Sequence, residues 1–350
     1  MRTALRCDQS ALGLSLLLVA LLLSPVALSW IGPPSRIEAY KSISTEAGTV
    51  GTVIQAIYKS PPEGDVVLLG SSLVSAGISQ PVVQAALSQH LHRPASVQVL
   101  AMNWPGLDVQ YFMLRDYLNT HRARLVVWNL PEPHARAYDY PHIQAYRWLR
   151  YGEYADALDG LPFQYRMALY GETIIGAPRL LLSILRPNLV RNEGTAIDPA
   201  LDRTGYLGAK FVPDDSSPSS AANYAQLLPL DSPSIAVRGP VLGAYQMHFA
   251  RLIVTLAKQH HCRVVLLHLP IGAEYNDSAV PELSDWKAQL DANYSMIAVS
   301  SAGLFDGMDR SRFEHFFRDT HLNENGRRYF TQAILPALQQ AFDESAPNQE

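Results

Sequence analysis

The chain has few cysteines, no excess of positive charge and no metal-binding histidine pattern. Its 350 residues include two cysteines and carry a formal net charge of −4. Cys7 precedes an N-terminal hydrophobic run and Cys262 lies far along the chain, so we expect neither a disulfide between them nor a cysteine-based metal site. The eleven histidines show no ligand spacing such as HExxH, and no Lys/Arg cluster points to nucleic acid. We therefore predict no metal, no cofactor and no nucleic-acid partner.

What the chain does have is a long uncharged segment near its N-terminus. Residues 11–31 contain no charged side chain, and Arg2 and Arg6 precede them. This length can span a bilayer, and the flanking arginines favour an N-terminus inside and the rest of the chain outside the cytoplasm. A cleaved signal peptide, with residues 27–29 as the cleavage site, is the competing interpretation. The anchor is preferred because the run exceeds a usual signal-peptide core, and cleavage would give a secreted protein.

Composition divides the chain into an anchor, a connector and one large domain. Residues 1–32 are the signal-anchor or signal peptide, and residues 33–64, with a Pro-Pro pair near each end, are expected to be a membrane-proximal connector. Residues 65–345 form the domain, with an insertion at about 132–240. The insertion is rich in tyrosine, with short helical stretches and a loop at 212–239. It predicts either a lid or sugar-binding surface, or a subdomain whose tyrosines only pack.

Apolar segments that alternate with helical patterns predict the α/β class. Four buried strands are expected at residues 65–69, 97–102, 125–128 and 264–270. Short connections between them indicate a doubly wound, mostly parallel sheet in three layers, with the helical insertion after the third strand. Further along, Trp286, Leu290 and Ile297 indicate a helix, and residues 304–305 indicate a short fifth strand.

A hydroxyl-rich turn follows the first strand, and it meets a candidate base from the other end of the chain. Ligands collect at the carboxyl ends of parallel strands, where Gly70, Ser71 and Ser72 stand. A serine nucleophile needs a base, and Asp319 and His321 offer a carboxylate that can orient an imidazole. Separately, these residues suit helix caps. Together they favour a Ser-His-Asp site.

These residues together resemble the SGNH (GDSL-like) hydrolase superfamily. Residues 70–72 match its nucleophile block, Gly106 its second block, Asn129 its third and residues 319–321 its last. The resemblance implies an SGNH/flavodoxin-like fold in which Ser72 attacks a carbonyl, His321 is the base and Asp319 orients it. The Ser72 and Gly106 backbone N–H groups and the Asn129 amide would form the oxyanion hole.

The finer resemblance is to membrane-anchored O-acyltransferase-type members. The Asp-Thr-His spacing is similar to alginate O-acetyltransferase-like proteins, and the Gly-Ser-Ser turn after an anchor is similar to the D-alanyl transfer protein. It implies an extracytoplasmic O-acyl transferase or esterase that modifies a cell-envelope or secreted polysaccharide, with a carbohydrate or acylated substrate and a membrane O-acyltransferase as partner.

Two points stay open at this stage. The third block lacks the family's Gly-x-Asn-Asp pattern around Asn129, which favours the alternative of a catalytically inactive SGNH-like sugar-binding or assembly subunit. His134 and His268 follow or end predicted strands, so with Ser71 they are candidate pocket residues. For both histidines, a packed or solvated side chain is the competing interpretation.

Overall fold

The chain forms two compact units, Met1–Ile43 with Ile143–Glu193, and Ser44–His142 with Gly194–Glu350. The computed structural model describes residues 2–31, 35–43, 48–103, 105–129, 146, 149, 157, 159–185, 225–229, 243–272, 295–299, 304, 314–318 and 321–345. The segment expected as a connector, residues 33–64, contributes one helix to each unit. Each unit is described by itself below.

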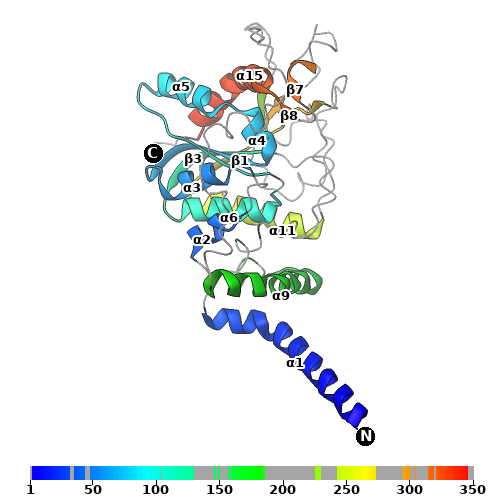
Figure 1. The fold of residues 1–350 in the computed structure, drawn as a ribbon. Helices are drawn as coiled ribbons and strands as arrows, with labels where there is room; N and C mark the ends of the chain where they lie inside the picture. Colours follow the sequence, from blue (N-terminus) through cyan, green and yellow to red (C-terminus); the bar gives the residue numbers. More distant parts are fainter. Residues whose placement is uncertain are drawn as a thin grey trace. The chain divides into compact units, whose positions relative to one another are not determined.

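A six-stranded sheet in the order β2-β1-β3-β5-β6-β4 is the centre of the larger unit (Figure 1). Its strands are β1 (Glu63–Gly70), β2 (Val97–Ala101), β3 (Arg122–Asn129), β4 (Ala225–Pro229), β5 (Arg263–Leu267) and β6 (Ser295–Val299). The first five in spatial order are parallel, and β4 pairs antiparallel with β6 at the edge. The class is therefore α/β, as the sequence predicts.

Helices pack on both faces of this sheet (Figure 1). On one face are α4 (Ser72–Gly77), α5 (Gln80–Leu91) and α15 (Glu324–Asp343), and on the other are α3 (Val50–Tyr58), α6 (Leu107–Leu118) and α11 (Ala244–Gln259). A strand covered on both sides must be apolar at successive positions, and residues 66–69 of β1 are all fully buried. The continuous apolar runs of the sequence reflect this double covering.

The connections reverse direction between β1 and β3. After β1 the chain crosses to β2 on one side of it, and then returns to β3 on the other side. In open α/β sheets, ligands bind at such a reversal, outside the carboxyl ends of the strands. The register brings these ends level, because Gly70 pairs with Ala101 and Asn129 pairs with Leu267. The turn that carries Ser72 lies at this edge.

Two expectations for residues 286–305 are wrong where the structure describes them. Ile297 was expected in a helix, but it is fully buried in β6, and Leu304 was expected in a strand, but it is helical. An apolar residue such as Ile297 fits either period, and here pairing with β5 on one side and β4 on the other decides for the strand. Trp286 and Leu290 lie outside the described residues.

The insertion is also more regular than expected. The predicted loop 212–239 contains β4, whose pairing with β6 extends the sheet by one strand. Only short helical stretches are expected in the insertion, but α9 (Phe163–Leu185) is a helix of 23 residues, in the smaller unit. In both cases, tertiary pairing or packing supports an element that the local sequence indicates only weakly.

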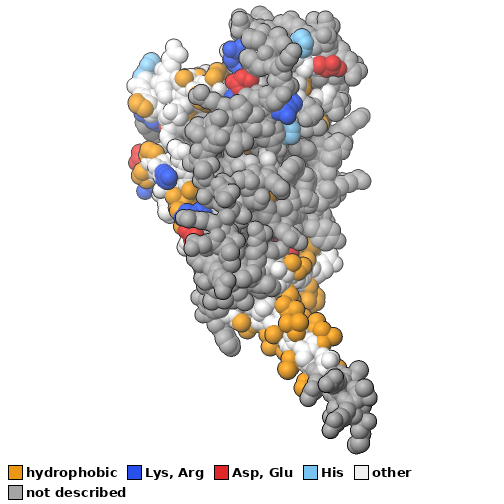
Figure 2. Space-filling model, in the orientation of Figure 1, with side chains coloured by type: hydrophobic (Ala, Val, Ile, Leu, Met, Phe, Trp, Pro, Cys, Tyr) orange, Lys and Arg blue, Asp and Glu red, His pale blue; other side chains and the backbone are white. Residues whose placement is uncertain are grey.

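The smaller unit consists of α9 together with α1 (Arg2–Ile31) and α2 (Arg36–Lys41). Within α1, Ser10–Ala27 has a mean hydropathy of 2.2 and is almost entirely exposed, so by length and composition it is a candidate signal-anchor or membrane span. Figure 2 shows the hydrophobic side chains along this helix. The Tyr170 hydroxyl of α9 donates to the Leu22 carbonyl of α1 at 2.6 Å, and the two helices pack against each other.

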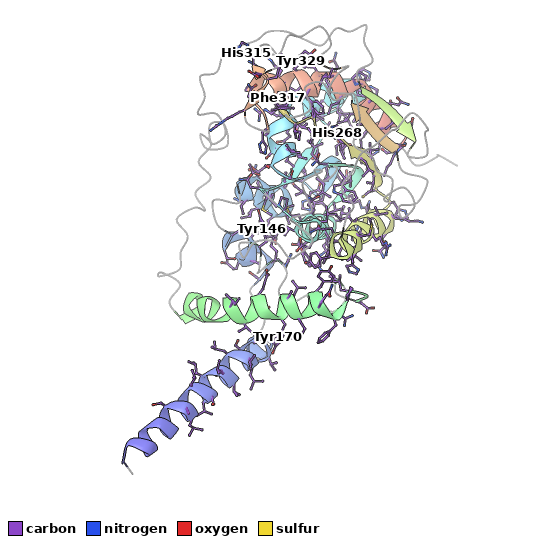
Figure 3. All side chains as sticks on the ribbon, turned by 90° about the vertical axis from the view of Figure 1, so that its right-hand side faces the viewer. Tyr146, Tyr170, His268, His315, Phe317 and Tyr329 are labelled. Atoms are coloured by element: carbon purple, nitrogen blue, oxygen red, sulfur yellow. The ribbon has the colours of Figure 1, made fainter. Side chains whose placement is uncertain are left out.

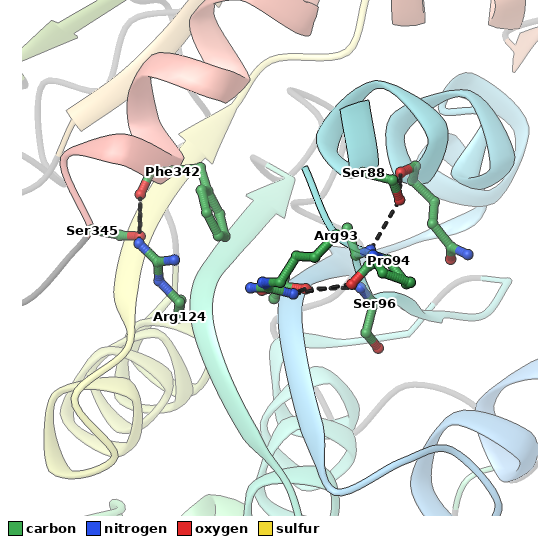
Figure 4. Close-up of polar contacts among 10 residues, drawn as sticks. Ser88, Arg93, Pro94, Ser96, Arg124, Phe342 and Ser345 are labelled. Atoms are coloured by element: carbon green, nitrogen blue, oxygen red, sulfur yellow. Dashed lines mark hydrogen bonds and ion pairs between the residues drawn. The ribbon is translucent and has the colours of Figure 1, made fainter. Parts of the chain in front are cut away.

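At the amino ends of the strands, a buried carboxylate fixes the start of β1. Asp65 accepts hydrogen bonds from Arg93 Nη2 at 2.5 Å and Nη1 at 3.0 Å, and from the Ser96 N–H at 2.8 Å. Figure 4 shows Arg93 and Ser96 beside one another here. Burial acts to raise the pKa of Asp65, but the hydrogen bonds from Arg93 and Ser96 and the charges of Arg93 and Arg124 outweigh it and lower this pKa.

The Asp65 carboxylate is expected to stabilise the larger unit. Asp65→Asn should lower the free energy of unfolding by about 1–3 kcal/mol at pH 7, because the group is buried and accepts three hydrogen bonds. Its folded-state pKa is lowered, so the contribution is complete above the ordinary carboxyl pKa and is lost as the pH falls below about 4.

Denaturant unfolding of the wild type and of Asp65→Asn, from pH 7 to below about pH 4, measures this difference in the free energy of unfolding. Asp343→Asn is the matched control, since Asp343 pairs with His90 at 2.8 Å but is 54% exposed, and it should change stability by less than about 1 kcal/mol. Equal stability of wild type and Asp65→Asn at pH 7 would contradict the assignment.

Candidate functional site

Ser72 is the first residue of α4, directly after the turn that ends β1. The residue before it, Ser71, is the N-cap, and its hydroxyl accepts a hydrogen bond from the Leu73 N–H at 3.2 Å. Capping, the structural alternative for Ser72, is thus performed by Ser71. The Ser72 hydroxyl is left for another partner, although its side chain is only 4% exposed.

That partner is His321. Ser72 Oγ lies 2.8 Å from His321 Nε2, across a separation of 249 residues in the sequence. His321 begins β8 (His321–Leu322), a short strand that pairs antiparallel with β7 (Phe317–Arg318) and packs against α4. The distance is that of a hydrogen bond between a nucleophile and its base. The structure therefore brings together the two residues on which the sequence hypothesis depends.

The start of α15 holds the His321 segment in place. Asn323 caps this helix by accepting from the Gly326 N–H at 3.0 Å, and its own N–H donates to the Phe316 carbonyl at 2.8 Å. Its side-chain Nδ2 also donates to the His315 carbonyl at 2.5 Å. A Cβ at Gly326 would overlap the Phe316 carbonyl oxygen, so only glycine lets the helix approach the β7 segment this closely.

Two predicted site residues lie outside the described part of the chain. Asp319, assigned to orient the His321 imidazole, and His134, a candidate pocket residue, are both in this group. Their roles stay predictions. The hydrogen bond between Ser72 and His321 is established without them.

Asn129 ends β3 beside the turn that precedes Ser72. Its side chain is buried, with 3% exposure, and a Cβ at Gly70 would lie 2.7 Å from Asn129 Cβ. The missing side chain of Gly70 thus allows the two strand ends to approach. Asn129 Oδ1 accepts no hydrogen bond from any residue that the structure describes. This free oxygen is an acceptor and suits a donor such as a substrate hydroxyl, whereas only the Nδ2 of the same amide can donate to a substrate oxygen.

Gly106 is the N-cap of α6, and α11 fixes its surroundings. The Leu107 N–H donates to Gln246 Oε1 at 2.8 Å, and the Tyr245 hydroxyl donates to Asp108 Oδ2 at 2.9 Å. All four of these side chains are buried, so the two helix starts are joined by a polar network inside the protein. The sequence analysis missed Gln246 and Tyr245, because neither belongs to a recognisable motif and only the packing of α11 on α6 gives them partners.

His268 follows β5 directly and is buried, with 6% exposure (Figure 3). Because Leu267 is level with Asn129, His268 stands at the same edge of the sheet as the other strand ends. Among the described residues, no group of three or more His, Cys, Asp or Glu side chains is arranged to hold a metal ion.

Cys262, the second potential nucleophile, directly precedes β5, at the amino ends of the parallel strands. Burial raises the pKa of its thiol to about 11, and the thiol donates a hydrogen bond to the Ala123 carbonyl at 3.0 Å. A thiol with this pKa is protonated near neutral pH and therefore unreactive. Of these two residues, only Ser72 thus stays a candidate nucleophile.

A broad hollow lies near Cys262, at the amino ends of the strands and away from Ser72. The charged side chains that line it are Glu63, Asp65, Arg93, Arg122, Arg124, Lys258, Arg263 and Glu344. Two of its arginines are paired, Arg93 with Asp65 and Arg263 with Glu344 at 2.6 Å. Arg124 packs over the Phe342 ring at 4.0 Å (Figure 4). These contacts give the hollow a structural explanation.

The close approach at Gly326 gives a test of how the His321 segment is held. Gly326→Ala should lower the free energy of unfolding by about 1–3 kcal/mol, because the new methyl group would displace the Phe316 carbonyl. An ordinary glycine within a helix gains stability when alanine replaces it. Urea unfolding measures the change, and a stabilised variant would show that the contact does not constrain the helix.

The site thus rests on a Ser–His hydrogen bond at the carboxyl edge of the sheet, with a buried asparagine and a buried histidine at the ends of neighbouring strands. Those positions follow from the paired registers of β1, β3 and β5. Comparison of the chain with models of known protein families and with curated proteins gives no match. The chemistry of the site is consequently argued from its own geometry.

Proposed function

We propose that this protein is a Ser-dependent O-acyl transferase or esterase of the SGNH type, acting outside the cytoplasm on a cell-envelope or secreted polysaccharide. The observation that carries the proposal is the 2.8 Å contact between Ser72 Oγ and His321 Nε2. The proposal includes the three-layer, doubly wound SGNH/flavodoxin-like fold. The strand order, and the position of Ser72 at the reversal between β1 and β3, support that classification.

In the proposed reaction, Ser72 Oγ attacks the carbonyl carbon of an acyl donor, and its proton passes to His321 Nε2. The protonated imidazole then gives this proton to the leaving oxygen, which departs as the donor's alcohol and leaves the acyl group on Ser72. For His321 to accept the proton at Nε2, its neutral ring must carry hydrogen on Nδ1. Asp319 is proposed to accept a hydrogen bond from that N–H.

Negative charge develops on the carbonyl oxygen during the attack, and hydrogen-bond donors must stabilise it. The proposed donors are the Ser72 and Gly106 backbone N–H groups and the Asn129 amide. Ser72 and Gly106 stand at the starts of α4 and α6, where helix N–H groups have no acceptor within the helix. The network from Gln246 to the Leu107 N–H is proposed to keep the Gly106 peptide in position.

In the second half of the reaction, an acceptor hydroxyl attacks the acyl carbon and His321 removes its proton. The bond between the acyl carbon and Ser72 Oγ then breaks, and His321 returns the proton to Ser72 Oγ. Water as acceptor gives an esterase, and a sugar hydroxyl gives a transferase. The candidate membrane span in α1 favours transfer, since a tethered enzyme can receive acyl groups from a membrane O-acyltransferase. This preference rests on analogy with anchored members of the family.

Labelling with a fluorophosphonate probe tests the nucleophile. The wild-type protein should be labelled, and Ser72→Ala should abolish both labelling and hydrolysis of p-nitrophenyl acetate, with a loss of about 10³-fold or more in kcat. Ser71→Ala is the matched control. It should retain labelling while losing about 1 kcal/mol of stability, because it removes only the helix cap.

Two other outcomes of this experiment would contradict the assignment of Ser72 as the nucleophile. Labelling that persists in Ser72→Ala and disappears in Ser71→Ala would move the nucleophile by one residue. A wild-type protein that neither reacts nor hydrolyses the ester would favour the inactive sugar-binding or assembly subunit.

The Asn129 amide gives an independent prediction. Asn129→Ala should lower kcat by about 10²–10³-fold with little change in KM, because the lost donor acts mainly on the transition state. Circular dichroism of the variant controls for folding, since the side chain is buried. An unchanged kcat in the folded variant would remove Asn129 from the oxyanion hole.

A further inference from the structure

The long helix of the smaller unit, α9, exposes large apolar side chains. Phe163 is 75% exposed, Met167 is 50% exposed and Ile175 is 64% exposed. On the opposite side of the helix, Tyr165, Leu169 and Thr173 are buried at a spacing of four residues. The helix therefore has a packed side and an unpacked apolar side.

The unpacked side carries no charge over the part of α9 whose side chains the structure describes. With successive residues about 100° apart around a helix, Phe163, Met167 and Ile175 share a face with small or uncharged residues (Gln164, Ala168, Gly171 and Ile174). The charged residues Arg166 and Glu172 fall at the two borders of this face, beside the buried side. This pattern is typical of a helix that lies flat in a membrane interface.

A hydrogen bond joins α9 to the candidate membrane span of α1. The Tyr170 hydroxyl donates to the Leu22 carbonyl at 2.6 Å, and Figure 3 shows Tyr170 at the junction of the two helices. Leu22 is inside the candidate span Ser10–Ala27, five residues before its end. The contact therefore places Tyr170 beside the uncharged part of α1.

The backbone hydrogen bonding of α1 around Leu22 is compatible with a position inside a bilayer. Pro25 lacks an N–H and so frees the Leu21 carbonyl from its usual helix partner. The Ser24 hydroxyl donates to that carbonyl at 2.6 Å, and Tyr170 donates to the next one, of Leu22. Polar backbone groups within a bilayer must find partners in the protein, and these two have them.

We propose that α9 is an interfacial helix whose uncharged face, with Phe163, Met167 and Ile175, lies in the lipid of the same bilayer that α1 enters. Lipid is the occupant because α9 packs against α1 and contacts its candidate span through Tyr170, and the exposed leucines of that span already suit hydrocarbon. The smaller unit then holds the membrane by two helices, one inserted and one lying along the surface. This proposal is independent of the chemistry at Ser72.

The test uses the full chain in vesicles of phosphatidylethanolamine and phosphatidylglycerol. Cys7→Ser removes one native thiol, and Cys262 is buried. Met167→Cys and Ile175→Cys are each labelled with an environment-sensitive fluorophore and exposed either to doxyl-labelled lipids or to aqueous iodide. Leu18→Cys, 52% exposed within the span, is the control for lipid contact, and Gln89→Cys, exposed on α5, is the control for water contact.

We expect the labels at positions 167 and 175 to be quenched several-fold more by doxyl lipid than the label at position 89, and to resist iodide as the label at position 18 does. Quenching by iodide as strong as at position 89 would overturn the proposal. Protection from both quenchers would also overturn it, because a protein partner or a second copy of the chain would then cover the face.

Discussion

The candidate site depends on one constraint, the meeting of a strand end with a short hairpin from the far end of the chain. In the proposed reaction, Ser72 is activated only while His321 stays at hydrogen-bond distance, and folding alone brings the two residues together across 249 residues. The packing of α4 against β8 and of α15 against α4 makes this meeting possible. Catalysis at this site would therefore require the whole larger unit to be folded.

The candidate site also requires that two neighbouring serines have different hydrogen-bond partners. A helix beginning at a nucleophile needs a cap, and a serine that caps its own helix has its hydroxyl engaged with backbone N–H groups. Here Ser71 accepts the Leu73 N–H, so the hydroxyl of Ser72 can face His321 instead. Asp and Ser are both good N-caps, so either side chain at position 71 would cap this helix.

The sequence predicts the centre of the sheet because unbroken apolar strands are a strong local signal. The meeting of Ser72 with His321 is predicted only by combining the two segments, through their joint resemblance to a known family, since each residue alone also suits a helix cap. The sequence does not predict elements and residue roles that depend on contacts with distant parts of the chain. Ile297 could belong to a helix or a strand until β4 and β5 paired with its segment, and the roles of Gln246 and Arg93 exist only through contacts with distant residues. Long-range pairs of this kind leave no periodic trace in one sequence.

In the proposed location outside the cytoplasm, the burial of Cys262 would protect its thiol, because such compartments are oxidising. A single exposed thiol there would form mixed disulfides or join two copies of the chain, since exchange requires an accessible thiolate. This thiol is 7% exposed, donates to the Ala123 carbonyl and has a raised pKa, so it offers neither access nor charge. In that location, the larger unit would keep this unpaired cysteine without becoming cross-linked through it.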